Sequence, residues 1–369
     1  MADRSRKPSS AQKISRNAVL QAARRHFIEG ETQAAIAEDL GITAGYLARL
    51  LKGAREQGWV KIIVDSDRET ELAAALMARY PHLVHCEVVP SGPTPEATAR
   101  AIGTAMSMWF DDLLDRDEES GDPQIWKVAI GGAWPHQVLV DQVVRRKNRI
   151  SVAPTALTPN PAKIERYTAP VVAAKLADRL GALSPANASG QEGERRGFLY
   201  SPTFRPPIGS LDELRTFFAE IENDPDYQVM LDFWRDTDVV FASVSSVRAD
   251  GGYGDMRNRL ASIGLSAQPL IDRGAVAVMS NRFLNADGDD VPLAVGMPPS
   301  YEVVIPTDAI RGAISGDRRG ASRRGFVVLD AWGELEPRAP LAAVTNANVF
   351  FADGLMATKL VSLSPPARG

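Results

Sequence analysis

The chain has 369 residues, of which 44% are hydrophobic and 24% charged, and this composition excludes a disordered chain, a collagen-like repeat and a disulfide-stapled scaffold. Its single cysteine, Cys86, excludes an intrachain disulfide and a cysteine-rich zinc site. The net charge of −4 hides an asymmetry, because residues 1–64 hold 11 Lys and Arg against 6 Asp and Glu, whereas the remainder holds 31 against 40. A basic front on an acidic body indicates that the front is the part that meets a polyanion such as nucleic acid.

Length and hydropathy set two further expectations. A chain of 369 residues exceeds the usual size of one domain, so two domains or a large domain with an appendage are expected. No run approaches eighteen uninterrupted apolar residues, and residues 1–13 lack the apolar segment of a secretory signal. We therefore expect a cytoplasmic protein whose polar, basic residues 1–13 form a disordered arm.

Three short helices are expected in residues 14–56, because apolar residues recur there at helical spacing. Thr32 can cap the second helix and Thr43 the third, and Gly41 between them permits a tight left-handed turn. This order is typical of a helix-turn-helix, whose last helix enters the major groove of DNA. The apolar segment WVKIIV, residues 59–64, reads as an extended wing, so the whole unit is predicted to be a winged helix-turn-helix.

The predicted partner of this unit is double-stranded DNA. Arg49 is a candidate base reader because its forked guanidinium matches the acceptors of guanine, whereas Lys52 and Arg55 are expected to hold phosphates. Backbone N–H groups at the start of the second helix also favour a phosphate. The alternative is a solvated basic face that is used for protein contacts. The predicted DNA-binding residues are Thr32, Gln33, Thr43, Ala44, Tyr46, Arg49, Lys52 and Arg55.

A charged break, DSDRET at residues 65–70, is the predicted linker between a DNA-binding domain at residues 14–64 and a body at residues 71–369. Strand and helix patterns alternate along the body, which predicts an α/β fold with a mostly parallel sheet. Among these patterns, DQVVRRK at residues 141–147 predicts a helix and GAVAVMSNRFL at residues 274–284 predicts a strand. The other predicted strands include LVHCEVVP (83–90), IWKVAIGG (125–132), RISVAP (149–154), DVVFASVSS (238–246), GFVVLDAW (325–332) and NVFFAD (348–353).

Long stretches of the sequence resemble the SorC-type bacterial transcriptional regulators, a sugar-binding family. The match begins with GETQAAIAEDLGITAGYLARLLKGAREQGWVKIIV (30–64), which resembles that family's helix-turn-helix and wing, and continues with KVAIGGAW (127–134), TDVVFASVSSV (237–247), LIDRGAVAVMSNRFLNADGDDV (270–291) and LAAVTNANVFFADGLMATKLV (341–361). The resemblance covers almost the whole chain from about residue 14. It implies a Rossmann-like α/β effector domain related to sugar-phosphate isomerases, a small effector that is often a phosphorylated sugar, and a homodimer or homotetramer.

Several predicted strands end in residues suited to a small ligand, because parallel α/β sheets bind ligands beyond the carboxyl ends of their strands. Glycines there let backbone N–H groups approach the ligand, and serine hydroxyls suit a polyol. The alternatives are a plain strand-to-helix turn for the glycines, a capped turn for the serines and a solvated position for Arg282 and Asp353. The predicted ligand-binding residues are Gly131, Gly132, Ala133, Trp134, His136, Ser243, Ser245, Ser246, Arg282, Trp332 and Asp353.

The chain departs from the family it resembles in two places. The family's glycine loop usually supplies a Thr or Ser to a phosphate, but GGAWPHQ, residues 131–137, offers neither. A lysine that commonly neutralises the ligand is missing from DAWGELEPRAP, residues 330–340, where two glutamates stand instead. We therefore expect an unphosphorylated sugar or polyol, with Trp134 or Trp332 stacked on its apolar face.

The main alternative function is an enzyme similar to a sugar-phosphate isomerase with an appended helical protein-contact module. That chemistry needs a base, and of the four histidines only His136 lies near the glycine loop, where a lone histidine is more often a packing or hydrogen-bonding residue. The acidic run NADGDD, residues 285–290, lacks the twelfth-position carboxylate of an EF-hand and is better explained by a hairpin turn. The sequence therefore predicts a regulator with no catalytic residues, no metal and no cofactor.

Overall fold

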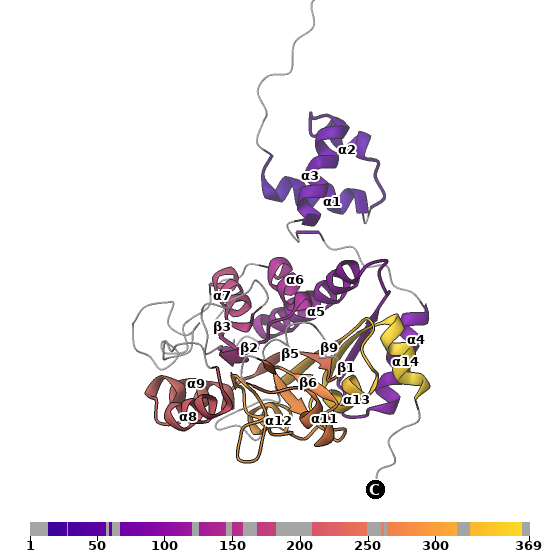
Figure 1. The fold of residues 1–369 in the computed structure, drawn as a ribbon. Coiled ribbons are helices and arrows are strands. Elements are labelled where there is room, and N and C mark those ends of the chain that lie inside the picture. Colours follow the sequence, from indigo (N-terminus) through magenta and orange to yellow (C-terminus); the bar gives the residue numbers. More distant parts are fainter. Residues whose placement is uncertain are drawn as a thin grey trace, which may run out of the picture. The chain divides into compact units, whose positions relative to one another are not determined.

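The chain divides into two compact units, residues 1–63 and residues 64–369 (Figure 1). The structure is a computed structural model. It describes residues 14–27, 29–56, 59–60, 67–119, 125–144, 150–157, 168–181, 209–248, 260–261, 264–315 and 325–363.

The first unit contains three helices, at the positions that the sequence predicts: α1 (Arg16–Phe27), α2 (Gln33–Asp39) and α3 (Ala44–Glu56). The hydroxyls of Thr32 and Thr43 accept hydrogen bonds at 3.2 Å from the backbone N–H groups of Ala35 and Tyr46, so each caps a helix as expected. Gly41 between α2 and α3 has a φ of 64°. Their apolar core consists of Ala22, Ala23, Ile36, Ala37, Leu47 and Leu51. Beyond Trp59 and Val60, the predicted wing lies outside the described residues.

An ion-pair network joins the first two helices of this unit. Arg25 of α1 donates hydrogen bonds to Glu31 at 2.8 and 2.6 Å and to Asp39 of α2 at 2.5 Å. The guanidinium of Arg25 holds the pKa of Glu31 below its ordinary value. The network holds α1 against α2.

A mostly parallel sheet forms the centre of the second unit, as the sequence predicts (Figure 1). All neighbours along its main path pair in parallel. In spatial order, the strands of this path are β1 (His85–Val89), β10 (Val349–Asp353), β9 (Phe326–Ala331), β5 (Val239–Ser246), β2 (Trp126–Ile130) and β3 (Ile150–Pro154).

Short strands extend this framework. β6 (Ala277–Met279) pairs antiparallel with the end of β5 and with β7 (Arg282–Leu284). The single strand predicted over residues 274–284 is therefore a hairpin, because Ser280 and Asn281 take positive φ values of 47° and 66° and reverse the chain. A separate pair is formed by β4 (Ala156–Leu157) and β8 (Val303–Val304).

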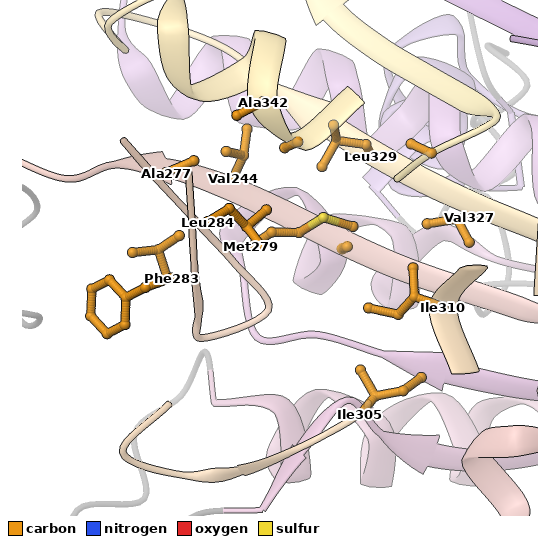
Figure 2. Close-up of a cluster of buried hydrophobic side chains, with 14 of the residues drawn as sticks. Val244, Ala277, Met279, Phe283, Leu284, Ile305, Ile310, Val327, Leu329 and Ala342 are labelled. Carbon is orange, nitrogen blue, oxygen red and sulfur yellow. The ribbon is translucent and has the colours of Figure 1, made fainter. Parts of the chain in front are cut away.

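Helices cover both faces of the sheet (Figure 1). On one face lie α5 (Pro95–Glu119), α6 (Trp134–Gln142) and α7 (Ala169–Leu180), whose apolar residues share one buried cluster with alternate strand residues such as Ile130, Phe241 and Val328. The intervening strand residues belong to the cluster of the other face, which Figure 2 shows around Met279, Leu329 and Ile310. That face is covered by α4 (Asp67–Arg79), α8 (Leu211–Ile221), α9 (Pro225–Arg235), α11 (Gln268–Asp272), α12 (Thr307–Ser315), α13 (Arg338–Val344) and α14 (Gly354–Ser362).

Two predicted boundaries need correction. The predicted linker at residues 65–70 is not wholly irregular, because α4 begins at Asp67; Asp67 and Glu69 suit a first turn, where carboxylates complement the helix dipole. Of the helix predicted over residues 141–147, only residues 141 and 142 are helical, as the end of α6, which begins at Trp134 with a proline in its first turn; residues 145–147 lie outside the described residues.

In the described part of the chain, no helix is long and apolar enough to cross a membrane. The same residues contain no group of three or more His, Cys, Asp or Glu side chains placed to hold a metal ion.

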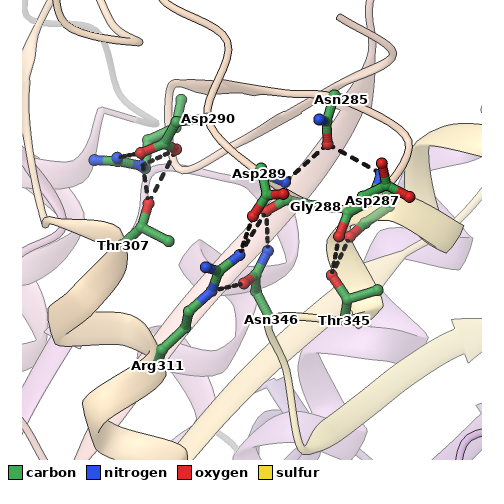
Figure 3. A network of polar contacts seen from close by, with 11 residues as sticks. Asn285, Asp287, Gly288, Asp289, Asp290, Thr307, Arg311, Thr345 and Asn346 are labelled. Carbon is green, nitrogen blue, oxygen red and sulfur yellow. Dashed lines mark hydrogen bonds and ion pairs between the residues drawn. The ribbon is translucent and has the colours of Figure 1, made fainter. Parts of the chain in front are cut away.

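The acidic run at residues 285–290 forms a turn fixed by protein groups (Figure 3). The side-chain oxygen of Asn285 accepts hydrogen bonds from the backbone N–H groups of Asp287 and Asp289, at 3.0 and 2.9 Å. Arg311 of α12 binds the Asp289 carboxylate at 2.8 Å, and the Asn346 amide donates to the Gly288 carbonyl at 2.7 Å. The turn predicted at Asp-Gly is thus confirmed, and it is anchored to α12 and to the end of α13.

Gly288→Ala is expected to lower the free energy of unfolding by about 2–4 kcal/mol, the sum of a left-handed backbone penalty and local overpacking. Gly288 has a φ of 83°, and a Cβ there would lie 2.0 Å from Thr345 Oγ1 and 2.7 Å from the Ala342 carbonyl oxygen. Urea unfolding measures the loss. Gly296→Ala is the control, because Gly296 has a φ of 71° but no atom within 4 Å of its Cβ position. Equal losses in the two variants would contradict the steric argument.

Cys86 is expected to resist alkylation at pH 8 in the folded protein. Burial in β1 raises the pKa of its thiol to about 12, and only the thiolate reacts. Relative to a thiol of ordinary pKa, this shift reduces the thiolate fraction at pH 8 by about a thousandfold. Iodoacetamide labelling followed by mass spectrometry, with and without urea, measures the protection. Because Cys86 is the only cysteine, labelling then reports unfolding of the second unit alone. Rapid labelling without urea would contradict this expectation.

Candidate DNA-binding face and effector site

The outward side of α3 is a continuous exposed surface. Leu47, Leu51 and Ala54 are buried, whereas the opposite positions are exposed. We call this surface the α3 face; its exposed residues are Thr43, Ala44, Gly45, Ala48, Arg49, Lys52 and Arg55. Three cations lie on one side of one helix, which suits the phosphates of a duplex.

Tyr46 lies at the border of the α3 face and supports Arg49. The Tyr46 ring is half-buried, and the guanidinium carbon of Arg49 lies 5.6 Å from its centroid, within the range of a cation–π contact. Such a contact limits the freedom of the arginine side chain. Arg49 is thereby partly ordered before any partner arrives.

The two predicted residues at the start of α2 have partners inside the unit. Thr32 uses its hydroxyl oxygen as the helix cap, and the Gln33 amide lies 3.1 Å from Nε2 of His26. His26 is in turn bonded through Nδ1 to the Glu31 carbonyl, at 2.9 Å. Gln33 therefore helps to hold α2 against α1, and its predicted contact with DNA stays a prediction.

In the second unit, the strand order changes direction between β2 and β5. β2 is followed along the chain by β3 on one side, whereas β5, β9 and β10 are added in sequence on the other. Connections leaving β2 and β5 therefore diverge, which is the arrangement that opens a ligand crevice at the carboxyl ends of the strands. Gly131, directly after β2, and Ser243, in the second half of β5, lie at this point.

A buried polar group occupies the switch point, and we call it the His136 cluster: His136, Ser243 and Asp330. Strand alternation directs Ser243 and Asp330, direct partners across β5 and β9, toward the face covered by α6. Asp330 Oδ1 lies 3.0 Å from His136 Nε2 and accepts a hydrogen bond from the Ser243 hydroxyl at 2.6 Å. His136 and Asp330 are 0% and 1% exposed, whereas Ser243 is half-buried. Ser243 is therefore the accessible member.

Backbone and side chains crowd around Gly131 beside this cluster. The Gly131 carbonyl accepts a hydrogen bond from His136 Nδ1 at 2.8 Å. A Cβ on Gly131 would lie 3.2 Å from the Phe241 carbonyl oxygen and 3.3 Å from Oγ1 of Thr155. Thr155 is 1% exposed, and its hydroxyl has no hydrogen-bond partner. Glycine at position 131 thus leaves room for the Phe241 carbonyl of β5, for Thr155 after β3 and for the His136 ring of α6.

The β6–β7 turn borders the same place. The backbone N–H of Ser280 points to the Ser243 carbonyl oxygen at 3.4 Å, and the buried Ser280 hydroxyl has no hydrogen-bond partner. Asn281 donates to the carboxylate of Glu302 at 2.5 Å, and Glu302 is only 5% exposed. The β6–β7 turn thus meets the backbone of β5 at Ser243 and binds a second buried carboxylate, Glu302, through Asn281.

Two predicted ligand residues have polar partners within the protein. Arg282 is 5% exposed, forms a bidentate ion pair with Asp290 and donates to the Ile305 carbonyl at 2.9 Å. Asp353 caps α14 by accepting from the Met356 N–H at 3.2 Å. It also accepts from the Ser91 hydroxyl at 2.6 Å. These bonds use three of the five guanidinium N–H groups of Arg282, and the ligand contacts of both residues stay predictions.

The other predicted residues lie along the carboxyl edge without forming one group. Ser246 is 5% exposed and accepts from the Glu336 N–H at 2.9 Å. Gly132 is exposed, whereas Ala133, Trp134, Ser245 and Trp332 are half-buried. Their predicted ligand contacts stay predictions.

Sequence reasoning missed Asp330, Thr155, Ser280 and Glu302. The sequence could have predicted a buried, partnered Asp330, because a carboxylate inside the apolar run GFVVLDAW is unusual and needs a partner. Period-two alternation from Val328 then places Asp330 on the same face as the partner strand's serine.

Comparison with known proteins shows the fold. No protein-family model and no curated protein sequence matches the chain. Among solved structures, the full-length sorbitol operon regulator SorC of Klebsiella pneumoniae matches with a TM-score of 0.63 at 19% identity, over 95% of this chain and 100% of that one. A probable sor operon regulator from Shigella flexneri matches with a TM-score of 0.57 at 14% identity, over 80% and 100%. A domain of a possible sugar-binding transcriptional regulator from Arthrobacter aurescens TC1 matches with a TM-score of 0.54 at 18% identity, over 81% and 100%. The predicted resemblance to SorC-type regulators is therefore confirmed at the level of the fold.

Proposed function

We propose that this chain is a DNA-binding transcriptional regulator whose affinity for its operator changes when a small hydroxylated effector binds the second unit. The α3 face carries the proposal: three exposed cations on the third helix of a capped, separately packed three-helix unit. The shared fold supports it, since the sorbitol operon regulator of Klebsiella matches nearly the whole chain. The effector site is the carboxyl edge of the sheet around the His136 cluster.

Regulation follows from linkage between the two sites. An effector changes DNA affinity only if it binds two arrangements of the protein with different affinity, and such coupling is typically about 1–3 kcal/mol. One helix-turn-helix covers few base pairs, so a homodimer or homotetramer that joins several α3 faces binds an operator far more tightly. We propose such an oligomer, located in the cytoplasm with the DNA.

The salt dependence of DNA binding tests the proposal. Fluorescence anisotropy of the full-length protein with a labelled duplex is expected to show an affinity that falls steeply with salt, by about 0.9 log units per log unit of salt for each phosphate held. The double variant Lys52→Ala/Arg55→Ala is expected to weaken binding and to flatten this slope by about one unit per cation removed.

The matched control removes the same charge from the second unit. Arg116 and Arg235 have exposed side chains, so Arg116→Ala/Arg235→Ala changes the net charge equally and leaves the α3 face intact. A control variant that flattens the slope as much as the α3 variant would refute the DNA-binding role of α3. Binding that does not depend on salt would favour the protein-contact alternative.

The isomerase-like alternative loses its candidate base in this structure. His136 is 0% exposed, with Nδ1 bonded to the Gly131 carbonyl and Nε2 facing Asp330. A general base has to reach the proton it removes, and neither ring nitrogen of His136 is accessible. We therefore propose that the chain has no such activity, and no measured turnover of sugar phosphates is expected.

A further inference from the structure

Gly45 is a glycine that the first unit does not need for its own packing. It lies in the first turn of α3, on the α3 face, and a Cβ there would meet no neighbouring atom within 4 Å. Its backbone is helical, so no left-handed turn requires a glycine either. Glycine also lowers helix stability relative to alanine. The absence of a side chain at position 45 therefore points to a partner that approaches this surface closely.

Arg49 lies one turn after Gly45 on the same face and is directed toward the start of α3. Its guanidinium carbon lies 5.6 Å from the centroid of the Tyr46 ring, which belongs to the residue three positions earlier. Long side chains on a helix lean toward its N-terminal end, and the ring contact favours this direction for Arg49. Of the exposed residues in the first two turns, Arg49 alone has a long polar side chain.

The position of Arg49 along the helix suits a base, whereas the other two cations suit phosphates. The start of a recognition helix is the part that reaches the base edges in the major groove. At a rise of about 1.5 Å per residue, Lys52 and Arg55 lie about 12 and 16 Å beyond Ala44, and the groove is only about 12 Å wide. These two side chains therefore reach the border of the groove, where the phosphates are.

The exposed side chains beside Arg49 at the start of α3 are methyl groups. Ala44 and Ala48 lie one turn apart, and the hydroxyl oxygen of Thr43 caps the helix. A methyl group packs against the C5-methyl of thymine, and a guanidinium fork binds O6 and N7 of guanine. The exposed residues of these two turns include no Asn or Gln, which would suit adenine, and no Asp or Glu, which would suit cytosine.

We propose that α3 reads a guanine through Arg49 and neighbouring thymine methyl groups through Ala44 and Ala48, and that Gly45 lets the helix approach the base edges closely enough for these contacts. Tyr46 is a positioning residue, because it orients Arg49. The inference rests on the proposed function and specifies its operator: each half-site holds a guanine with thymine beside it.

The test begins with selection of duplexes from a random library by the full-length protein, at a salt concentration that suppresses nonspecific binding. The selected sites are expected to share a guanine with a thymine within two base pairs. Anisotropy with the selected duplex then measures two base replacements. Exchange of the guanine for 7-deazaguanine removes the N7 acceptor and is expected to weaken binding at least fivefold. Exchange of the thymine for uracil removes one methyl group and is expected to weaken binding about fourfold.

Variants of Arg49 and Tyr46 assign the guanine contact. Arg49→Ala is expected to weaken binding of the selected duplex about 5- to 150-fold for each half-site and to remove the response to 7-deazaguanine. Lys52→Ala is the control, because loss of a phosphate contact weakens selected and unrelated duplexes alike and leaves that response intact. Tyr46→Leu is expected to shrink the response at least threefold, whereas Tyr46→Phe keeps the ring and retains it.

Gly45→Ala tests the close approach and has a matched control on the same helix. Gly53 also lies in α3, and a Cβ there would also meet no neighbouring atom within 4 Å, but it follows Gly45 by two turns. Neither Gly45→Ala nor Gly53→Ala is expected to lower the free energy of unfolding, because alanine is the better helix former. Gly45→Ala is expected to weaken binding of the selected duplex at least tenfold, and Gly53→Ala less than twofold.

Four results would overturn the inference: selected sites without a shared guanine, an equal response to 7-deazaguanine in the wild type and in Arg49→Ala, no response to uracil, or equal losses for Gly45→Ala and Gly53→Ala. Each of these results is compatible with salt-dependent binding through the α3 face, which the salt titration measures separately. Absence of DNA binding even at low salt would instead refute the proposed function, and the inference with it. The two failures are therefore distinguishable.

Discussion

His136→Ala is expected to lower the free energy of unfolding of the second unit by about 3–5 kcal/mol, because it leaves two buried hydrogen-bond acceptors without their partner and opens a cavity. Asp330 would keep its carboxylate, which is 1% exposed, and would lose the imidazole that lies 3.0 Å away. The Gly131 carbonyl would lose its hydrogen bond as well. Urea unfolding followed by Cys86 labelling measures the loss in this unit alone.

A second substitution separates the charge from the cavity that alanine leaves. Adding Asp330→Asn to His136→Ala removes the unpaired carboxylate, so the double variant is expected to be more stable than His136→Ala alone. His85→Ala controls for loss of an imidazole, because the His85 side chain is 36% exposed and lies 3.7 Å from Glu87 at the sheet edge. A loss for His136→Ala no larger than that for His85→Ala would show that the buried pair contributes nothing.

Leu47→Ala is expected to abolish DNA binding while leaving the second unit folded. Leu47 is 0% exposed and belongs to the buried apolar cluster of the first unit. A buried Leu→Ala change lowers the free energy of unfolding by about 3–5 kcal/mol, which is as large as the whole stability expected of so small a unit. Anisotropy with labelled duplex at low salt is expected to show at least a hundredfold loss of affinity, whereas Cys86 protection stays unchanged.

Leu50→Ala is the control for this experiment, because Leu50 lies on the same helix but is only half-buried. It is expected to cost less stability and to retain salt-dependent binding. DNA affinity that survives in Leu47→Ala would mean that the basic sequence binds without its fold. In that case the geometry of the α3 face would not matter.

The first unit could be predicted closely because its information is local. Thr32, Gly41 and Thr43 mark the helix ends, and Leu47 and Leu51 mark the buried side of α3. Each of these signals acts within a few residues of the chain, so sequence spacing is enough to place it.

The parallel sheet could also be predicted, but the pairing that builds the site could not. Gly131 and Ser243 were expected at the strand ends, and both lie at the switch point. That Ser243 faces Asp330 depends on the order of β5 and β9 and on their register, which join residues 87 positions apart. Strand patterns alone do not contain this information.

Charged residues at strand ends were the least predictable. Arg282 and Asp353 have the composition expected of ligand contacts, yet one pairs with Asp290 and the other caps α14. The deciding fact in each case is a partner from another element, such as the Ile305 carbonyl for Arg282. A charge near a strand end therefore predicts a polar partner and does not say whether that partner is a ligand.

The pairing of β1 with β10 has a consequence for the order in which the chain becomes complete during translation. The Val84 N–H donates to the Asn348 carbonyl at 2.7 Å, and Arg79 of α4 donates to the Val361 carbonyl across 282 positions. The three-helix unit can fold soon after it emerges from the ribosome. In contrast, α4 and β1 lack these C-terminal partners until nearly the whole remaining chain has been synthesised. A product that stops before β10 would leave β1 without a partner strand and one edge of β9 exposed, and exposed strand edges favour aggregation with other chains.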